Sequence, residues 1–246
     1  MTEEERRASV IDFVNRSFRD MADQDYIGAR GMYRAELFPQ FLWLAHQAIE
    51  KYLKAILLYN DVSTIDLSHD IEKALSRLDQ ITDIPFDVPP QLRAFIARLN
   101  EQGPNRYFEY PAVLVGDELH MLDQSVWWLR RYCHWMRGTA RTPGGVVNRL
   151  QHEIEVVNSF GPSNAHRFRI RGGRLESLLS KRKDARREML VWKNFFYGSR
   201  KKRRVRFTRH GMVSNPAHYL DPEIFEDLKT RVQFSKAVKA MFNAHK

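Results

Sequence analysis

Cysteine is nearly absent from this 246-residue sequence, in which Cys133 is the only one. One thiol cannot build an internal disulfide framework, and such low cysteine usage is typical of a reducing compartment. No run approaches the roughly 20 uncharged apolar residues that a membrane-spanning helix needs. The first ten residues, MTEEERRASV, lack the apolar core of a signal peptide. We therefore expect a cytoplasmic protein with no membrane partner.

Familiar catalytic and cofactor motifs are also missing. The sequence contains no P-loop, no GxGxxG fingerprint, no GxSxG elbow, no zinc-ligand spacing and no Cys–His nucleophile signature. Asp117, His120 and Asp123 follow at three-residue steps, but such positions drift around a helix and no second ligand cluster accompanies them. No cofactor and no metal are expected.

The composition is that of a folded protein. Hydrophobic residues make up 43% and charged residues 28% of the chain, and 15 Phe, 9 Tyr and 5 Trp argue against disorder, which is poor in aromatic residues. The chain is long enough for one large domain or two small ones with a buried core.

Positive charge is concentrated in one part of the chain. Residues 137–209 contain 20 Lys and Arg against 5 Asp and Glu, an excess of 15, although the net charge of the whole chain is only +10. The remaining residues are therefore mildly acidic. An asymmetry of this kind usually indicates a polyanionic partner, with nucleic acid the first candidate and an anionic membrane surface the second.

The first 137 residues have the periodicity of amphipathic helices. Apolar residues recur at three- and four-residue steps, most clearly over 38–59, where Phe41, Leu44, Ala48 and Tyr52 lie on one face. Further helices are expected at about 8–37, 68–78 with Ser68 as N-cap, 91–99 and 115–136. Such segments, joined by short connections, predict a mainly α-helical, up-down bundle over residues 1–137.

The segment GTARTPGG at 138–145 is the best candidate boundary. Beyond it we expect a basic, mostly helical region over 146–246. It should contain helices near 146–157, 174–196 and 221–242, a strand at 166–171, and a small β-hairpin around His210-Gly211.

Three segments in order resemble the HEPN family (higher eukaryotes and prokaryotes nucleotide-binding) of helical bundles. LFPQFLWLAHQAIEKYLKAILL at 37–58 is similar to the family's second helix, LSHDIEKAL at 67–75 to the His-Asp opening of its third helix, and NRYFEYP at 105–111 to its Arg-Tyr segment. The resemblance covers about residues 8–137. It implies a HEPN-like bundle, a homodimer with a polar cleft between closing helices, and a role with nucleotides or RNA in toxin-antitoxin, defence or regulatory systems, where an operon-encoded partner protein is common.

Many members of that family are metal-independent ribonucleases with an Arg-x(4–6)-His motif. The expected place, near the closing helix, lacks it, since only three and two residues separate Arg130 and Arg131 from His134. The spacing does occur between Arg203 or Arg204 and His210, outside the bundle, where chance explains it. Cleavage by the usual family chemistry is therefore not expected.

The bundle nevertheless offers two sets of candidate residues. The resemblance suggests nucleotide-binding positions, although a solvated helix face and a helix N-terminus explain most of them equally well. A displaced ribonuclease site would use an arginine to stabilise phosphorane charge and histidines as general acid or base, although Arg106 could simply pair with Glu109. The nucleotide-binding set is Gln47, Glu50, Lys51, Lys54, His69, Asp70 and Tyr107, and the catalytic set is Arg106, His120 and His134.

The basic region supplies the candidates for nucleic-acid binding, with RNA favoured. Cations neutralise phosphates and release counterions, while neighbouring aromatic residues such as Phe195 and Phe207 can stack on unpaired bases. The candidates are Lys181, Arg182, Arg186, Arg187, Arg200, Lys201, Lys202, Arg203, Arg204 and Arg206. Two alternatives remain: a solvated cationic face, or a non-enzymatic module that meets an acidic protein.

Overall fold

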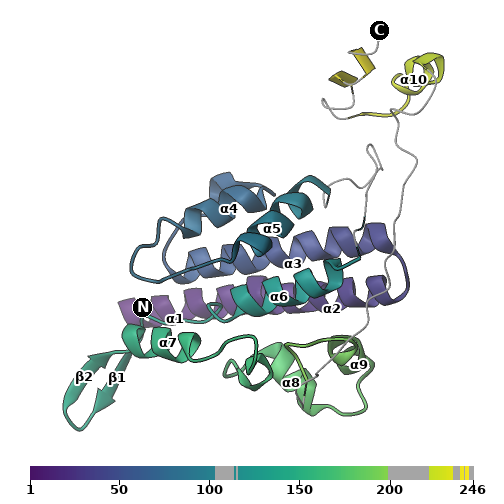
Figure 1. The fold of residues 1–246 in the computed structure, drawn as a ribbon. Coiled ribbons are helices and arrows are strands. Elements are labelled where there is room, and N and C mark those ends of the chain that lie inside the picture. Colours follow the sequence, from purple (N-terminus) through teal and green to yellow (C-terminus); the bar gives the residue numbers. More distant parts are fainter. Residues whose placement is uncertain (103–113, 115, 199–221, 235–238, 241, 244–246) are drawn as a thin grey trace.

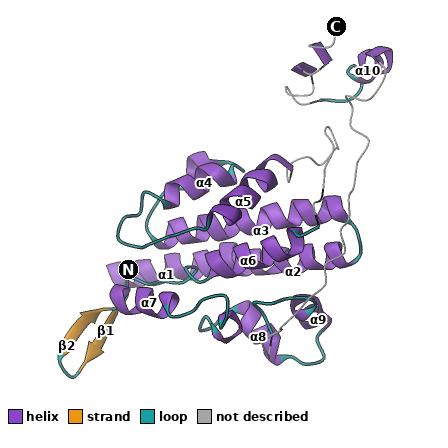
Figure 2. Cartoon of the chain, in the orientation of Figure 1, coloured by secondary structure: helices purple, strands orange, loops and turns teal. Residues whose placement is uncertain are grey.

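The computed structural model describes residues 1–102, 114, 116–198, 222–234, 239–240 and 242–243 (Figure 1). The described part is mainly α-helical, as the sequence predicted, and its two strands form one small hairpin (Figure 2). No helix among these residues is long and apolar enough to cross a lipid bilayer.

The chain begins with one long helical rod, built from α1 (Glu3–Val14), the π-helical turn η1 (Asn15–Arg19) and α2 (Asp20–Arg34). Thr2 caps its start, because the Thr2 hydroxyl accepts from the Glu5 N–H while the Glu5 carboxylate accepts from the Thr2 N–H. The helix predicted over about 8–37 is thus real but starts five residues earlier and ends three earlier. Its wide π turn was not expected.

Helix α3 (Phe38–Tyr59) lies along α2 and forms the centre of the bundle (Figure 1). Its bounds are those that the sequence predicted. Phe41, Ala48, Ile49, Tyr52 and Leu53 are fully buried, which follows from the apolar face at steps of three and four.

Helices α4 (Ile71–Leu78) and α5 (Pro90–Gln102) cover one side of α3. The N-cap of α4 is Asp70, whose carboxylate accepts from the Lys73 N–H at 2.9 Å. The prediction of Ser68 as this cap was wrong, because Ser68 adopts a left-handed backbone (φ 47°) two residues before it. A carboxylate at this position also favours the positive end of the helix dipole.

Helix α6 (Glu118–Arg130) closes the bundle against α2 and α3. It is shorter than the predicted 115–136, but its expected spine is buried as predicted. Two crossed ion pairs join it to α2: Arg130 binds Asp23, and Arg30 binds Asp123. Asp23 and Arg30 are seven residues apart on α2, and so are Asp123 and Arg130 on α6. The two helices therefore run antiparallel, and two helical turns separate the two ion pairs.

The predicted boundary at 138–145 is the hairpin of β1 (Thr139–Thr142) and β2 (Gly145–Asn148). After it come α7 (Leu150–Asn158), the 3₁₀ turn η3 (Ala165–Arg167), α8 (Arg174–Ser180) and α9 (Ala185–Val191). These elements pack on the bundle from the side opposite α4 and α5 (Figure 1). Their side chains Val157, Leu175 and Leu190 belong to the same hydrophobic core.

Several predictions for the second region need correction. The strand expected at 166–171 is η3 followed by loop, because Phe168 and Ile170 point into the core without a partner strand among the described residues. The helix expected over 174–196 is split into α8 and α9, since the Asp184 carboxylate caps a new helix by accepting from the Arg186 N–H. The helix expected over 221–242 is interrupted: α10 (Pro222–Leu228) is followed by a turn at 229–231, and residues 239–240 and 242–243 are again helical. The hairpin expected around His210-Gly211 lies outside the described residues.

Candidate nucleic-acid interface

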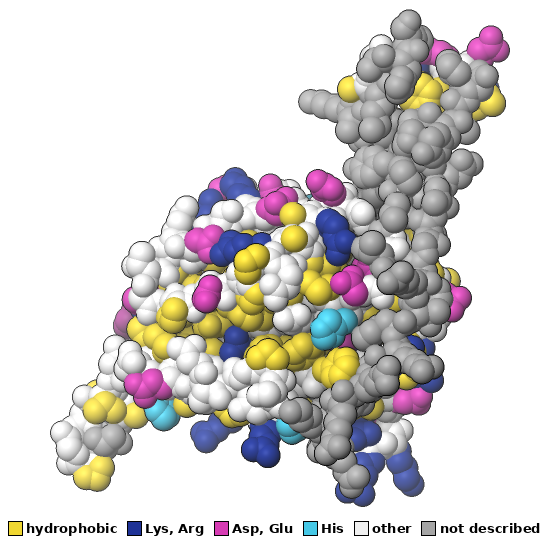
Figure 3. Space-filling model, viewed as in Figure 1, with side chains coloured by type: hydrophobic (Ala, Val, Ile, Leu, Met, Phe, Trp, Pro, Cys, Tyr) yellow, Lys and Arg dark blue, Asp and Glu magenta, His cyan; other side chains and the backbone are white. Residues whose placement is uncertain are grey.

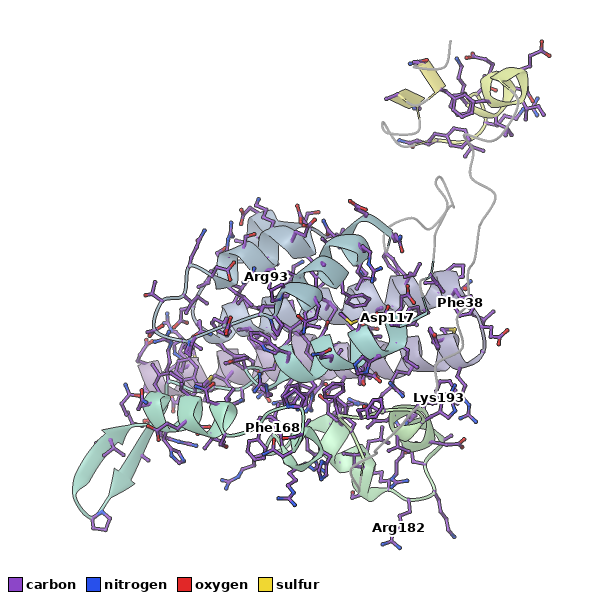
Figure 4. All side chains as sticks on the ribbon, in the orientation of Figure 1. Phe38, Arg93, Asp117, Phe168, Arg182 and Lys193 are labelled. Carbon is purple, nitrogen blue, oxygen red and sulfur yellow. The ribbon has the colours of Figure 1, made fainter. Side chains whose placement is uncertain are left out.

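Exposed cations gather along the loop and turn elements around α8. Lys181, Arg182 and Lys183 form the exposed turn between α8 and α9, and Arg182 extends away from the protein (Figure 4). Lysine and arginine side chains line the same edge of the surface in Figure 3, on the side away from α4 and α5. We call this surface the basic face and define it by Arg167, Arg171, Arg174, Lys181, Arg182 and Lys183.

The cations of the basic face lack carboxylate partners in the described part of the chain, unlike most cations of the bundle. Within the described residues, none of the six forms an ion pair. Most arginines of the bundle are paired instead, as Arg77 is with Asp66 at 2.6 Å and Arg93 with Asp79 at 2.6 Å, and among the described residues the exposed Arg6 and Arg98 are exceptions. Unpaired like charges on one surface repel each other and attract a polyanion.

Two predicted candidates are less available than their sequence positions suggested. The Arg186 guanidinium pairs with Asp184 at 2.6 Å, and the bond holds the pKa of that carboxyl at about 2. The Arg187 Nε donates to the Leu179 carbonyl at 2.9 Å, so its guanidinium fixes the turn after α8. The remaining predicted cations lie outside the described residues: Arg200, Lys201, Lys202, Arg203, Arg204 and Arg206.

Three arginines of the basic face were not singled out from the sequence. Arg167 and Arg171 lie between α7 and α8, and Arg174 begins α8. All three contributed to the charge excess, but they are scattered among apolar and glycine residues rather than clustered. The alternation of buried Phe168 and Ile170 with exposed arginines was the signal that could have placed them on one surface.

The nucleotide-binding candidates on α3 do come together. The Lys54 Nζ lies 2.7 Å from Glu50, the His69 Nδ1 lies 3.1 Å from Glu50, and Lys51 donates to Gln47 at 3.0 Å. Each charged side chain of this cluster already has a partner of opposite charge, since Lys51 also pairs with Asp25 at 2.6 Å. A role in nucleotide binding stays a prediction for these five residues.

The electrostatics of this cluster follow from its burial. Burial alone would raise the pKa of Glu50, but hydrogen bonds from Lys54 and His69 lower it below its usual value. Beside it, burial lowers the pKa of His46, whose ring nitrogens have no hydrogen-bond partner among the described residues. The partners of Glu50 thus favour its charged form, while burial disfavours the charged form of His46, whose Nδ1 lies 3.9 Å from Glu50.

Asp70 follows His69 in the sequence but has a different role from the cluster. Its carboxylate caps α4 and also accepts from the Asn100 amide at 3.3 Å. Tyr107, the last nucleotide-binding candidate, and Arg106, the predicted catalytic arginine, lie outside the described residues.

The two histidines proposed for catalysis are not brought together. His120 lies in the first turn of α6 against the rings of Phe195 and Phe196, whereas His134 follows the other end of the same helix. A rise of 1.5 Å per residue puts about 15 Å between His120 and the end of α6 at Arg130. One active site cannot use both from the same chain.

His134 lies among charged side chains at a cavity. It lines a cavity of about 280 Å³ together with Glu153, Arg149, Arg169 and Arg171. The His134 Nε2 lies 3.2 Å from Glu153, and burial lowers the pKa of the imidazole although the carboxylate opposes that shift. A histidine oriented by a carboxylate and flanked by arginines has the elements of a general base beside a phosphate.

Together these features describe a mainly α-helical bundle protein with a basic face built on its later elements. Residues 16–116 match the family profile of the HEPN domain. This match lies within the 8–137 span of the resemblance, and the HEPN family suggests a nucleotide- or RNA-related role. Among curated proteins and solved structures, none matches the chain.

Proposed function

We propose that this protein binds RNA through its basic face. The observation that carries the proposal is the contrast in pairing: the bundle's Arg77 and Arg93 have carboxylate partners, whereas Arg171, Arg182 and Lys183 have none among the described residues. A surface of this kind releases counterions when it meets phosphates. The HEPN domain supports RNA over other polyanions.

The salt dependence of binding tests this proposal. For a single strand, the slope of log K against log salt is about −0.7 per neutralised phosphate, so four contacts give a slope of about −2.8. Fluorescence anisotropy with a labelled single-stranded RNA between 50 and 200 mM salt measures it. RNA binding with no salt dependence, or no binding in dilute buffer, contradicts the proposal and favours a module that meets an acidic protein.

A matched pair of double variants locates the surface. Arg182→Ala with Lys183→Ala removes two charges from the basic face, whereas Arg6→Ala with Arg98→Ala removes two exposed charges from α1 and α5. The first pair should reduce the magnitude of the slope by about 1.4, and the second should leave it unchanged. Equal effects would mean that only net charge matters.

The HEPN domain also leads us to propose a homodimer that acts in a toxin-antitoxin, defence or RNA-regulatory system. In such a dimer the α3 cluster around Glu50 would line a polar cleft and bind a nucleotide. Light scattering after size exclusion distinguishes a mass near 58 kDa from the 29.1 kDa chain. A monomer at micromolar concentration would contradict the dimer without affecting the basic face.

Cleavage of the bound RNA is a second candidate function, favoured by the His134–Glu153 pair beside Arg169 and Arg171. The His134 Nε2 faces Glu153 and its Nδ1 is buried, so proton transfer from a ribose 2′-hydroxyl to this imidazole would require the His134–Glu153 contact to open. An assay in EDTA with wild type, His134→Ala and His120→Ala tests it. Loss of cleavage in His134→Ala alone supports the site, and equal rates in all three exclude it.

A further inference from the structure

A second, larger cavity lies between α2 and α8, at the edge of the basic face. Its volume is about 510 Å³, within the range of small-molecule sites. One wall is a single face of α2, with Asp20, Gln24 and Ile27 at steps of four and three. The other wall is the start of α8 with the turn before it, so the cavity joins the HEPN domain to the later elements.

Glycines keep the floor of this cavity open. Gly172 has a left-handed backbone (φ 69°), and its carbonyl lies 3.5 Å from the Arg19 guanidinium. A Cβ on Gly173 would lie 2.8 Å from the Arg130 Nη2, against the buried pair of Arg130 and Glu176. Gly173 therefore has no room for a side chain and lets the backbone pack against this pair, whereas the space beside Gly172 is open.

The lining carries an excess of positive charge. Arg174 and Lys181 line it with cations, whereas Arg186 already pairs with Asp184. The one carboxylate in the lining, Asp20, already pairs with Arg19 at 2.9 Å. Arg174 and Lys181 have no carboxylate partner among the described residues. An anion with several oxygen atoms satisfies such a set, because a guanidinium presents a planar fork that matches phosphate.

The deeper part of the cavity is apolar. Ile27 and Leu178 are exposed by only 8% and 5% and face it from opposite walls. Gln24 and Ser177 are exposed on the same rim and offer hydrogen-bond donors and acceptors. A flat ring between two aliphatic side chains, with polar groups at its edge, is the arrangement in which proteins hold an unstacked base.

We propose that this cavity binds one nucleoside monophosphate unit, either free or at the end of an RNA strand. Arg174 and Lys181 hold its phosphate, and the base lies between Ile27 and Leu178. The proposal deepens the RNA-binding role and rests on it for the strand-end form, since Arg174 and Lys181 also belong to the basic face. The free nucleotide form stands independently of RNA binding.

Calorimetry with adenosine monophosphate tests the cavity directly. Arg174→Ala should weaken binding tenfold or more, because it removes a charged partner of the phosphate. Arg182→Ala makes the same change of charge on the basic face but outside the cavity, so it should change the affinity less than twofold. Ser177→Trp should abolish binding by filling the space, with circular dichroism as the check that the variant folds.

The ligand series decides between the forms and sets the condition for rejection. If a 5′-phosphorylated RNA competes with the mononucleotide and its 5′-hydroxyl counterpart does not, the cavity holds a strand end; otherwise it holds the free nucleotide. Any of three results overturns the proposal: inorganic phosphate binds as tightly as the mononucleotide, Arg174→Ala and Arg182→Ala have equal affinity for the mononucleotide, or the mononucleotide fails to bind at millimolar concentration. Salt-dependent RNA binding that persists in Ser177→Trp would leave the basic face intact and reject the cavity alone.

Discussion

Arg130 holds the later elements to the bundle, and replacing it with methionine should expose how much that contact contributes. Its guanidinium donates to both oxygens of Asp23, at 2.7 and 2.9 Å, and to both oxygens of Glu176, at 2.7 Å each. Arg130→Met keeps much of the side-chain length and apolar bulk but leaves two buried carboxylates without their cation.

The expected cost at pH 7 is large. Removing one partner of a buried ion pair destabilises a protein by about 3–5 kcal/mol, because the remaining charge stays buried and uncompensated. With a urea m-value of about 3 kcal/mol/M, the unfolding midpoint should fall by about 1 to 2 M. Tryptophan fluorescence reports the transition, since Trp127 and Trp128 are buried on α6 beside Arg130.

The pH dependence gives the prediction its sharpest form. Burial alone would raise the pKa of Glu176, but the charge and hydrogen bonds of Arg130 lower it below its usual value. In the wild type this contribution is therefore present above the unfolded pKa and is lost as the pH falls through the lower folded value. In Arg130→Met the pKa of Glu176 rises instead, so the deficit relative to wild type should shrink between pH 7 and pH 5.

The control is Arg98→Met, which removes an exposed arginine of α5 and should change the free energy of unfolding by less than about 0.5 kcal/mol. A midpoint for Arg130→Met within 0.3 M of wild type, or a deficit that grows as the pH falls, would refute the reasoning that this pair is buried and ionised.

Three further predictions concern other buried groups. Gly173→Ala should cost about 1–3 kcal/mol in urea unfolding, because its Cβ would press on Arg130 and Glu176, and unchanged stability would contradict the packing. Burial raises the pKa of the Cys133 thiol, so a thiol reagent should label it only after unfolding, and fast labelling of the folded protein would exclude its burial. Burial lowers the pKa of His46, so its neutral form favours folding above about pH 6.5 and that contribution is lost as the pH falls; His46→Phe should then lose less stability than wild type between pH 7 and pH 5.

The central helices could be predicted from the sequence because their apolar faces are local patterns. The bounds of α3 and the buried spine of α6 follow from side chains three and four residues apart. The same reasoning joined α8 and α9 into one helix, since it gave no weight to Asp184 as a cap.

The crossed ion pairs could not be predicted in this way. Asp23 and Arg130 are 107 positions apart, and each looks like an ordinary surface charge on an amphipathic helix. Only the three-dimensional approach of α2 and α6 reveals that they are buried partners.

The candidate site was predictable in its chemistry and less so in its geometry. The charge excess located the basic face in the right part of the chain, but pairing decides which cations are free, and sequence does not give pairing. Arg186 is bound by Asp184, whereas Arg174, which was not singled out, is free of carboxylates within the described residues.

Because of the π-helical turn η1, the faces that α1 and α2 present are not related by regular α-helical winding. Each residue turns an α-helix by about 100°, so one residue removed between Asn15 and Arg19 would restore regular winding and rotate α1 by about that angle while α2 stays in place. One residue removed within α2 would instead swing Asp23 or Arg30 away from α6. A deletion at this turn should therefore cost only the contacts of α1, such as Arg7 with Asp61 and Val14 in the core, whereas a deletion a few residues later breaks the ion pairs that hold α2 to α6.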